Sequence, residues 1–134
     1  MPNAAYAQGA TFERRMCELL WARGWRPLRS AGSHSPADVV ALKDGQPPLA
    51  VQCKAGRSQV DWQHWAELWQ FSLDAGAMPV IAQRVLRHEP MLWLVTGPRP
   101  RYADVAKWTT PLDWDDLGLV VRHVVPEAHG VSMT

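Results

Sequence analysis

An acid, an amide and a lysine stand close together in the first half of the chain: Asp38, Gln52 and Lys54. Asp38 directly precedes an apolar run, residues 39–42, and a second apolar run that starts at Leu49 ends in Gln52 and Lys54. If the two runs form adjacent strands joined by a turn, the three side chains meet at one place. Carboxylate and amide oxygens are ligands for Mg²⁺, and a lysine cation stabilises charge on a phosphate. The pattern predicts metal-dependent hydrolysis of a phosphodiester.

The alternation of side chains along the second strand indicates which groups act together. Successive residues of a strand point to opposite faces, so Gln52 and Lys54 share one face. Val51 and Cys53 share the other face and, being apolar, suit the core. A bound Mg²⁺ would then draw on the Asp38 carboxylate, the Gln52 amide oxygen and the backbone carbonyl of Cys53. Lys54 would stabilise the transition state or orient the attacking water.

A helix ahead of these strands supplies a further acid. Residues 10–23 carry apolar side chains at the spacing of one helical face, which predicts an amphipathic helix. Thr11 is a suitable N-cap, and Gly24 suits the position that follows a helix end. Glu13 lies at the border of the apolar stripe. If the helix packs beside the two strands, Glu13 brings a third oxygen ligand to the same site.

The rest of the pattern alternates strand and helix. Residues 25–29 are expected to be a short extended segment, with Pro27 favouring a sheet edge, and residues 30–36 a polar loop. Asp61 is a suitable N-cap for a second helix. The other expected elements are strands at 37–43, 49–54, 79–86 and 91–96, a helix at 62–75, a short helical turn at 102–108, a connector or short helix at 111–117, and a strand or helix end at 119–125. This order predicts a mixed α/β architecture in a single domain, residues 1–134.

Charge is unevenly divided along the chain, although its net value is only +1. Residues 1–57 contain eight Lys and Arg against four Asp and Glu, whereas residues 58–134 contain six against nine. Five arginines precede the strand expected at 37–43: Arg14, Arg15, Arg23, Arg26 and Arg29. This bias favours a phosphate-binding face, and an ordinary solvated surface is the alternative.

The tryptophans, the cysteines and the apolar runs indicate what the protein could contact and in which cellular compartment it works. The eight tryptophans are expected in the core or at an interface, with base stacking as the alternative. Cys17 and Cys53 have no metal-ligand spacing and do not indicate a disulfide scaffold. No apolar run approaches the roughly 20 residues that span a bilayer, and the first residues lack a signal-peptide pattern. We therefore expect a cytoplasmic protein with no membrane partner.

The order of Glu13, Asp38 and the triplet Gln52-Cys53-Lys54 resembles the PD-(D/E)XK nuclease superfamily. In that superfamily an acid opens one strand and an acid-x-Lys motif lies on the next. More narrowly, residues 8–85 resemble the archaeal-type Holliday junction resolvases. The matching features are a helix with a Gly-x-x-x-Glu-Arg pattern, a Gly-aromatic pair and a Ser/Gly-rich loop, present here as Gly9 to Arg14, Gly24-Trp25 and residues 30–34.

This resemblance implies a restriction-endonuclease-like fold, with a mixed central β-sheet flanked by helices. It further implies a Mg²⁺-dependent endodeoxyribonuclease, with Mn²⁺ as a substitute and no nucleotide cofactor. The implied substrate is branched DNA, the four-way (Holliday) junction of recombination and repair. A homodimer would cut it with paired symmetric nicks, in the cytoplasm of a prokaryotic or archaeal cell or of the host of a virus.

The resemblance also implies roles for individual residues. The catalytic set is Glu13, Asp38, Gln52, Lys54 and Ser33. The metal ligands are Asp38, Gln52, Glu13 and Cys53. The DNA contacts are Arg14, Arg15, Arg29, Ser30, His34 and Arg57. A serine of the loop would hydrogen-bond the scissile phosphate, and a plain flexible turn is the alternative for that loop.

Gln52 departs from the family pattern, which has an acid at this position. An amide oxygen remains a hard ligand but carries no charge, so the site should hold a metal more weakly. Two alternatives therefore stay open. The chain is either another DNA nuclease of this fold, acting in repair or restriction, or a catalytically inactive DNA-binding relative.

Overall fold

The computed structural model describes residues 4–30, 35–56, 60–99, 101 and 103–117, with side chains from residue 8 onward. Its elements are α1 (Ala4–Ala22), β1 (Arg26–Arg29), β2 (Val39–Leu42), β3 (Leu49–Lys54), α2 (Trp62–Ala75), β4 (Met78–Gln83), β5 (Met91–Val95), the 3₁₀ turn η1 (Val105–Trp108), β6 (Thr109–Leu112) and the 3₁₀ turn η2 (Trp114–Asp116). The predicted element at 119–125 lies outside the described residues. No helix in the described part of the chain is long and apolar enough to cross a membrane.

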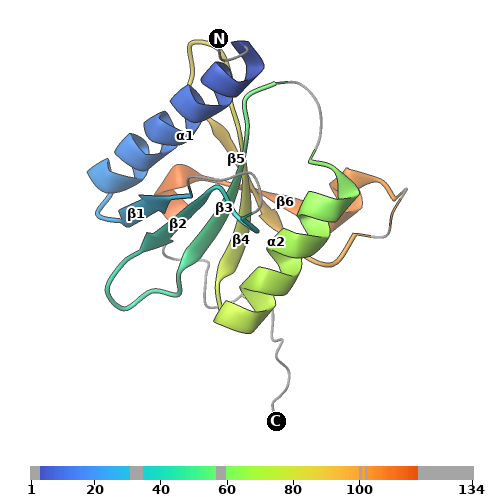
Figure 1. The fold of residues 1–134 in the computed structure, drawn as a ribbon. Coiled ribbons are helices and arrows are strands. Elements are labelled where there is room, and N and C mark those ends of the chain that lie inside the picture. The colour runs from blue at the N-terminus through green and yellow to red at the C-terminus, as the bar shows by residue number, and fades with distance from the viewer. Residues whose placement is uncertain (1–3, 31–34, 57–59, 100, 102, 118–134) are drawn as a thin grey trace.

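The six strands form a single mixed sheet in the order β1-β2-β3-β4-β5-β6 (Figure 1). β3 and β4 run parallel, and the other neighbouring pairs run antiparallel. A parallel pair needs a crossover connection, which α2 provides between β3 and β4. The mixed α/β sheet predicted from the sequence is confirmed.

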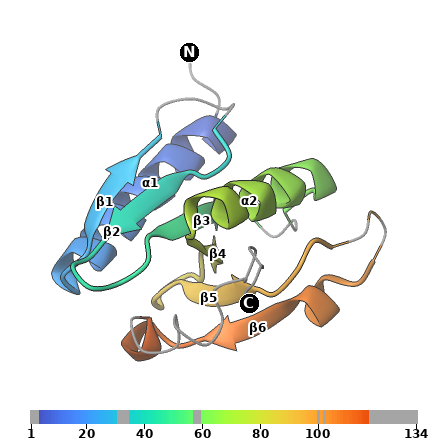
Figure 2. The ribbon, with the colours of Figure 1, turned by 90° about the horizontal axis from the view of Figure 1, so that it is seen from below.

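The two helices cover opposite faces of this sheet. Phe12 and Met16 of α1 pack in one apolar cluster with Val51, whereas Trp65 of α2 packs in a second cluster with Ala50. Because Ala50 and Val51 are successive strand residues, the two clusters lie on opposite faces, called here the α1 face and the α2 face. Figure 2 shows α1 on the side of β1 and β2, and α2 beside β3.

The boundaries of α2 agree with the sequence prediction because both of its caps are local. The Asp61 side chain accepts a hydrogen bond from the backbone N–H of His64, 2.9 Å away. At the other end, Gly76 adopts a left-handed conformation with φ 65°, which only glycine adopts at little cost. Helix α2 therefore begins and ends where side-chain chemistry dictates.

The start of α1 was predicted wrongly. The helix begins at Ala4 and passes through Gly9 and Thr11, so Thr11 is an interior residue and not an N-cap. The added turn is rich in alanine, the residue with the highest helix propensity. That propensity extends the helix past a locally acceptable cap.

Strand β6 was not predicted, because residues 109–112 form a four-residue segment with a proline and without alternation. Pro111 is tolerated because β6 is the edge of the sheet. The other edge, β1, contains Pro27, as predicted. Strands β2, β4 and β5 are shorter than expected, and η1 and η2 fall within the segments expected to be helical turns or connectors.

Candidate active site

Asp38 directly precedes β2 and lies opposite Gln52 of β3. Val39 pairs with Val51 in the antiparallel register, so the preceding residue faces Gln52. The Asp38 N–H donates to the Val51 carbonyl over 2.9 Å, and Asp38 Oδ2 accepts from the Cys53 N–H over 2.8 Å. These bonds fix the carboxyl group against the backbone of β3.

The pKa of Asp38 is raised above its usual value, chiefly because burial disfavours the charged form. The hydrogen bond from Cys53 opposes this increase, as do the positive charges of His64 and Lys54. Burial nevertheless outweighs them. A cation placed beside this carboxyl group would stabilise its charged form, and that is the electrostatic environment a metal ligand needs.

Residues 50–54 of β3 alternate between the two faces. Val51 belongs to the α1-face cluster, and Cys53 packs against that cluster. Gln52 and Lys54 therefore project from the α2 face, and both side chains are half-buried. Asp38 is opposite Gln52 in register, so it shares the α2 face with this pair. The acid, the amide and the lysine come together as the spacing predicted.

Glu13 reaches the same end of the sheet from α1. Its Oε1 accepts a hydrogen bond from Nε of Arg29, on β1, over 2.8 Å. Burial is the main reason that the pKa of Glu13 is raised, and repulsion from Asp38 raises it further. The Arg29 hydrogen bond acts in the opposite direction. The two carboxyl groups are thus near enough to influence each other, with Arg29 holding one of them.

Cys53 contributes its backbone N–H and carbonyl to the candidate site, and not its sulfur. Its N–H is used by Asp38, and burial raises the pKa of its thiol well above the ordinary value. A thiol held in the neutral form is a poor metal ligand, because the thiolate is the form that coordinates. The carbonyl oxygen is the Cys53 atom that suits a metal such as Mg²⁺.

The predicted DNA-contacting residues are only partly described. Ser30 continues the row of site residues, because its N–H donates to the Asp38 carbonyl over 2.8 Å. Arg14 and Arg15 are exposed on α1, next in sequence to Glu13. Arg29 is half-buried in its ion pair with Glu13, so it positions that acid. Ser33, His34 and Arg57 lie outside the described residues.

Sequence reasoning missed two contributors. The Glu13–Arg29 pair joins residues 16 positions apart, and no local pattern reveals it. His64 lies in the first turn of α2, and its positive charge, when it is protonated, acts to lower the pKa of Asp38. Its Nδ1 lies 2.6 Å from Asp61 Oδ2. The signal available for His64 was the Asp61 cap, which places residue 64 in the first helical turn.

The donor set fits a hard divalent cation with few protein ligands. Among the described residues, no three His, Cys, Asp or Glu side chains gather as a ready-made metal site. Asp38, the Gln52 amide and Glu13 offer oxygens only, as Mg²⁺ prefers. Mg²⁺ is commonly bound by one or two carboxylates, with water and substrate phosphate completing its shell. The residues present therefore suit a metal whose shell is finished by the substrate.

Comparison with known proteins agrees with this geometry. The family model of the archaeal Holliday junction resolvase (Hjc) matches residues 4–99, which include Glu13, Asp38, Gln52 and Lys54. The structure of Archaeoglobus fulgidus Hjc, a Holliday junction resolvase from an archaeal hyperthermophile, is similar to this chain, with 27% sequence identity and a TM-score of 0.55. The similarity covers 61% of this chain and 72% of that one. The chain belongs to the archaeal Holliday junction resolvase family.

Proposed function

We propose that this protein is a Mg²⁺-dependent endonuclease that resolves four-way DNA junctions by hydrolysing phosphodiesters. The observation that carries the proposal is the hydrogen bond from the Cys53 N–H to Asp38 Oδ2. It holds the carboxyl group against β3, opposite Gln52 and beside the face that carries Lys54. Mn²⁺ would substitute for Mg²⁺, because both accept oxygen ligands in octahedral geometry.

Each site residue has a distinct task in this proposal. Asp38 and the Gln52 amide bind the metal, with Glu13 and the Cys53 carbonyl as further oxygens. The metal, when bound, polarises the scissile phosphate and lowers the pKa of a water. Lys54 lies on the same face and stabilises the charge that develops on the phosphate oxygens. Ser30, next to Asp38 in the sheet, hydrogen-bonds the phosphate that is cut, and the neighbouring Ser33 is the other candidate in that loop.

Arginines next to the site would hold the DNA backbone. Arg14 and Arg15 follow Glu13 on α1 and are exposed to solvent. Arginine binds phosphate through two parallel hydrogen bonds, so this pair suits a strand that enters the site from the α1 side. Recognition of a junction then depends on the spacing of phosphates and not on base sequence. His34 and Arg57, which lie outside the described residues, stay proposed DNA contacts on the family resemblance alone.

A homodimer follows from the reaction, since two opposed strands must be cut. Helix α2 packs mainly on β3 and β4, and of β2 only Val40 packs against the cluster beneath α2. Leu28 of β1 and Leu42 of β2 are 65% and 47% exposed. Leu28, Val40 and Phe71 also line a groove of about 330 Å³. We assign this apolar patch (Leu28, Val40, Leu42 and Phe71) to a two-fold contact between protomers.

A catalytically inactive DNA-binding protein is the second candidate. Two observations favour it: Gln52 is neutral where a further acid would bind metal, and Glu13 is already paired with Arg29. Such a protein would keep the arginines and the junction contact but would hold no metal. A nuclease of the same fold with a linear DNA substrate is the third candidate.

Cleavage of labelled DNA separates these functions. The protein is incubated with a four-way junction or a matched linear duplex, in Mg²⁺, Mn²⁺ or a chelator. Paired symmetric nicks in the junction alone, dependent on metal and lost in Asp38→Asn, are the expected result. Cleavage of both substrates would indicate a linear-DNA nuclease. Junction binding without cleavage in either metal would indicate the inactive relative.

A further inference from the structure

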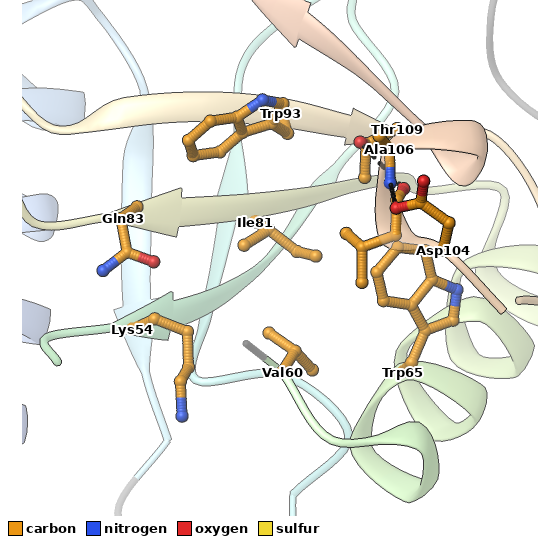
Figure 3. A pocket seen from close by; sticks show the side chains of 10 residues that line it. Lys54, Val60, Trp65, Ile81, Gln83, Trp93, Asp104, Ala106 and Thr109 are labelled. Atoms are coloured by element: carbon orange, nitrogen blue, oxygen red, sulfur yellow. Dashed lines mark hydrogen bonds between the residues drawn. The ribbon is translucent and has the colours of Figure 1, made fainter. Parts of the chain in front are cut away.

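A cavity of about 290 Å³ opens on the α2 face beside Lys54. Figure 3 shows Lys54 and Gln83 at one end, and Asp104, Thr109 and Trp65 at the other. Ile81, Val60 and Trp93 lie between the two ends. The cavity thus has an apolar centre, an aromatic wall and polar groups at both ends.

The sheet register connects this cavity to the proposed metal site. Gln52 pairs with Ile81, and Ile81 pairs with Trp93. Asp38, Gln52, Ile81 and Trp93 therefore form one row across four adjacent strands. Strands are spaced about 4.8 Å apart, so Trp93 lies roughly 10 Å from Gln52 along this row. That span is on the scale of one nucleotide, from its phosphate to the far edge of its base.

Asp104, at the far end of the cavity, can accept a hydrogen bond, and Trp93 offers a ring surface beside it. Asp104 Oδ1 accepts from the Ala106 N–H over 3.0 Å, and the carboxylate is otherwise exposed. Its second oxygen can accept a further donor. Trp93 is half-buried, so its indole supports the cavity wall while one part of the ring stays open.

We propose that this cavity receives one unpaired nucleobase of the DNA strand, next to the phosphate that Lys54 holds beside Asp38 and Gln52. The base stacks on Trp93, and an exocyclic amine donates a hydrogen bond to Asp104. Bases that carry such an amine, adenine, cytosine and guanine, are accepted better than thymine. The proposal rests on the proposed function, because the bound phosphate sets where the base enters.

Charge and solvation favour a nucleotide over an apolar occupant. Lys54 at one end attracts a phosphate, and Asp104 at the other accepts a donor. An apolar segment from a second protomer would bury the Asp104 carboxylate without replacing the hydrogen bonds that water makes to it, and such burial is unfavourable. Extruding a base costs a few kcal/mol in a duplex and least where pairing is already disturbed, as at a branch point. Stacking on an indole offsets part of that cost.

The test uses the full chain and a four-way junction with 2-aminopurine placed in turn at each position near the branch, in a chelator. We expect a change in 2-aminopurine emission at one position beside the cut. Trp93→Leu should abolish this change and weaken binding about tenfold. Trp62→Leu is the matched control, since Trp62 lies on the exposed side of α2, 43% exposed and outside the cavity. Circular dichroism and sedimentation verify folding and assembly.

A second variant protects the test against misfolding. Asn can replace Asp104 as the cap of η1, so Asp104→Asn should fold normally. Its amide can also donate to a thymine carbonyl. Wild-type protein is expected to bind a junction with thymine at that position about tenfold more weakly than one with adenine, and Asp104→Asn should reduce this difference.

These outcomes are separable from those for the proposed function, because binding is measured without cleavage. Emission changes in a protein that never cuts would support the cavity and overturn the nuclease. Metal-dependent cutting without an emission change at any position would support the nuclease and overturn the cavity. Loss of dimer in Trp93→Leu alone would assign the cavity to self-association and overturn the proposal.

Discussion

Glu13 and Arg29 form an ion pair between α1 and β1, with Oε1 and Nε 2.8 Å apart. Their side chains are 18% and 27% exposed, so the pair is shielded from most of the solvent. It connects the helix that carries one acid of the site to the edge strand next to Asp38. The position of Glu13 therefore depends on a residue that does no chemistry itself.

Arg29→Gln should destabilise the fold. Its loss leaves a half-buried carboxylate without its charged partner, which costs about 2 kcal/mol at neutral pH. The free energy of unfolding, measured by urea denaturation, is the check. Arg15→Gln, an exposed arginine on α1, is the control and should change it by less than about 0.5 kcal/mol. Equal effects of the two substitutions would contradict a structural role for the ion pair.

Asp38→Asn should stabilise the metal-free protein at neutral pH. The pKa of Asp38 is raised in the folded state, so folding favours the protonated carboxyl. Its contribution is fully present below the unfolded pKa and is lost as pH rises through the folded pKa. An amide keeps the acceptor for the Cys53 N–H and never ionises. The stabilisation should therefore be seen at pH 7 and should fade toward acid pH.

Chemical denaturation of both proteins across pH, in a chelator, measures this difference. Asp44→Asn is the control, because Asp44 is exposed in the turn between β2 and β3. A difference for Asp38→Asn that is constant with pH would show that titration is not its cause.

Gln52→Glu should lower the Mg²⁺ concentration needed for cleavage, by about tenfold. The added carboxylate restores a charged ligand in the same position, and metal affinity follows the charge of the ligand set. Cleavage rate against Mg²⁺ concentration gives the half-saturation point. Gln46→Glu adds the same charge in the β2–β3 turn and should leave that point unchanged. An unaltered requirement in Gln52→Glu would remove Gln52 from the metal site.

The double variant Leu28→Glu, Leu42→Glu should be a monomer. Both leucines lie in the apolar patch on β1 and β2, and charges there would be desolvated in a two-fold contact. Analytical ultracentrifugation measures the mass in solution, and the monomer should lose paired nicking. Leu86→Glu is the control, because Leu86 is 73% exposed in the β4–β5 turn, away from the patch. A dimer in all three proteins would place the interface elsewhere.

Local chemistry explains which parts of the structure were predictable. Asp61 caps the start of α2 and Gly76 its end, each through hydrogen bonds to residues a few positions away. The alternation of side chains along β3 places Gln52 and Lys54 on one face. In contrast, the Glu13–Arg29 pair depends on how α1 packs against β1, which no local pattern encodes. Strand β6 exists because β5 offers an unpaired edge, so its four residues need no strand signal of their own. The cavity likewise combines residues from β3, β4, β5, α2 and η1.

The Cys53 N–H that holds Asp38 has a consequence for how the site opens. That amide is part of β3, an inner strand flanked by β2 and β4, and its side chain packs on the core. Its hydrogen should exchange slowly with deuterated solvent, because exchange requires the bond to Asp38 to open. The proposed metal ligand Asp38 is thus attached to an inner strand of the sheet. We therefore expect the DNA, and not the sheet, to change conformation at this end of the site.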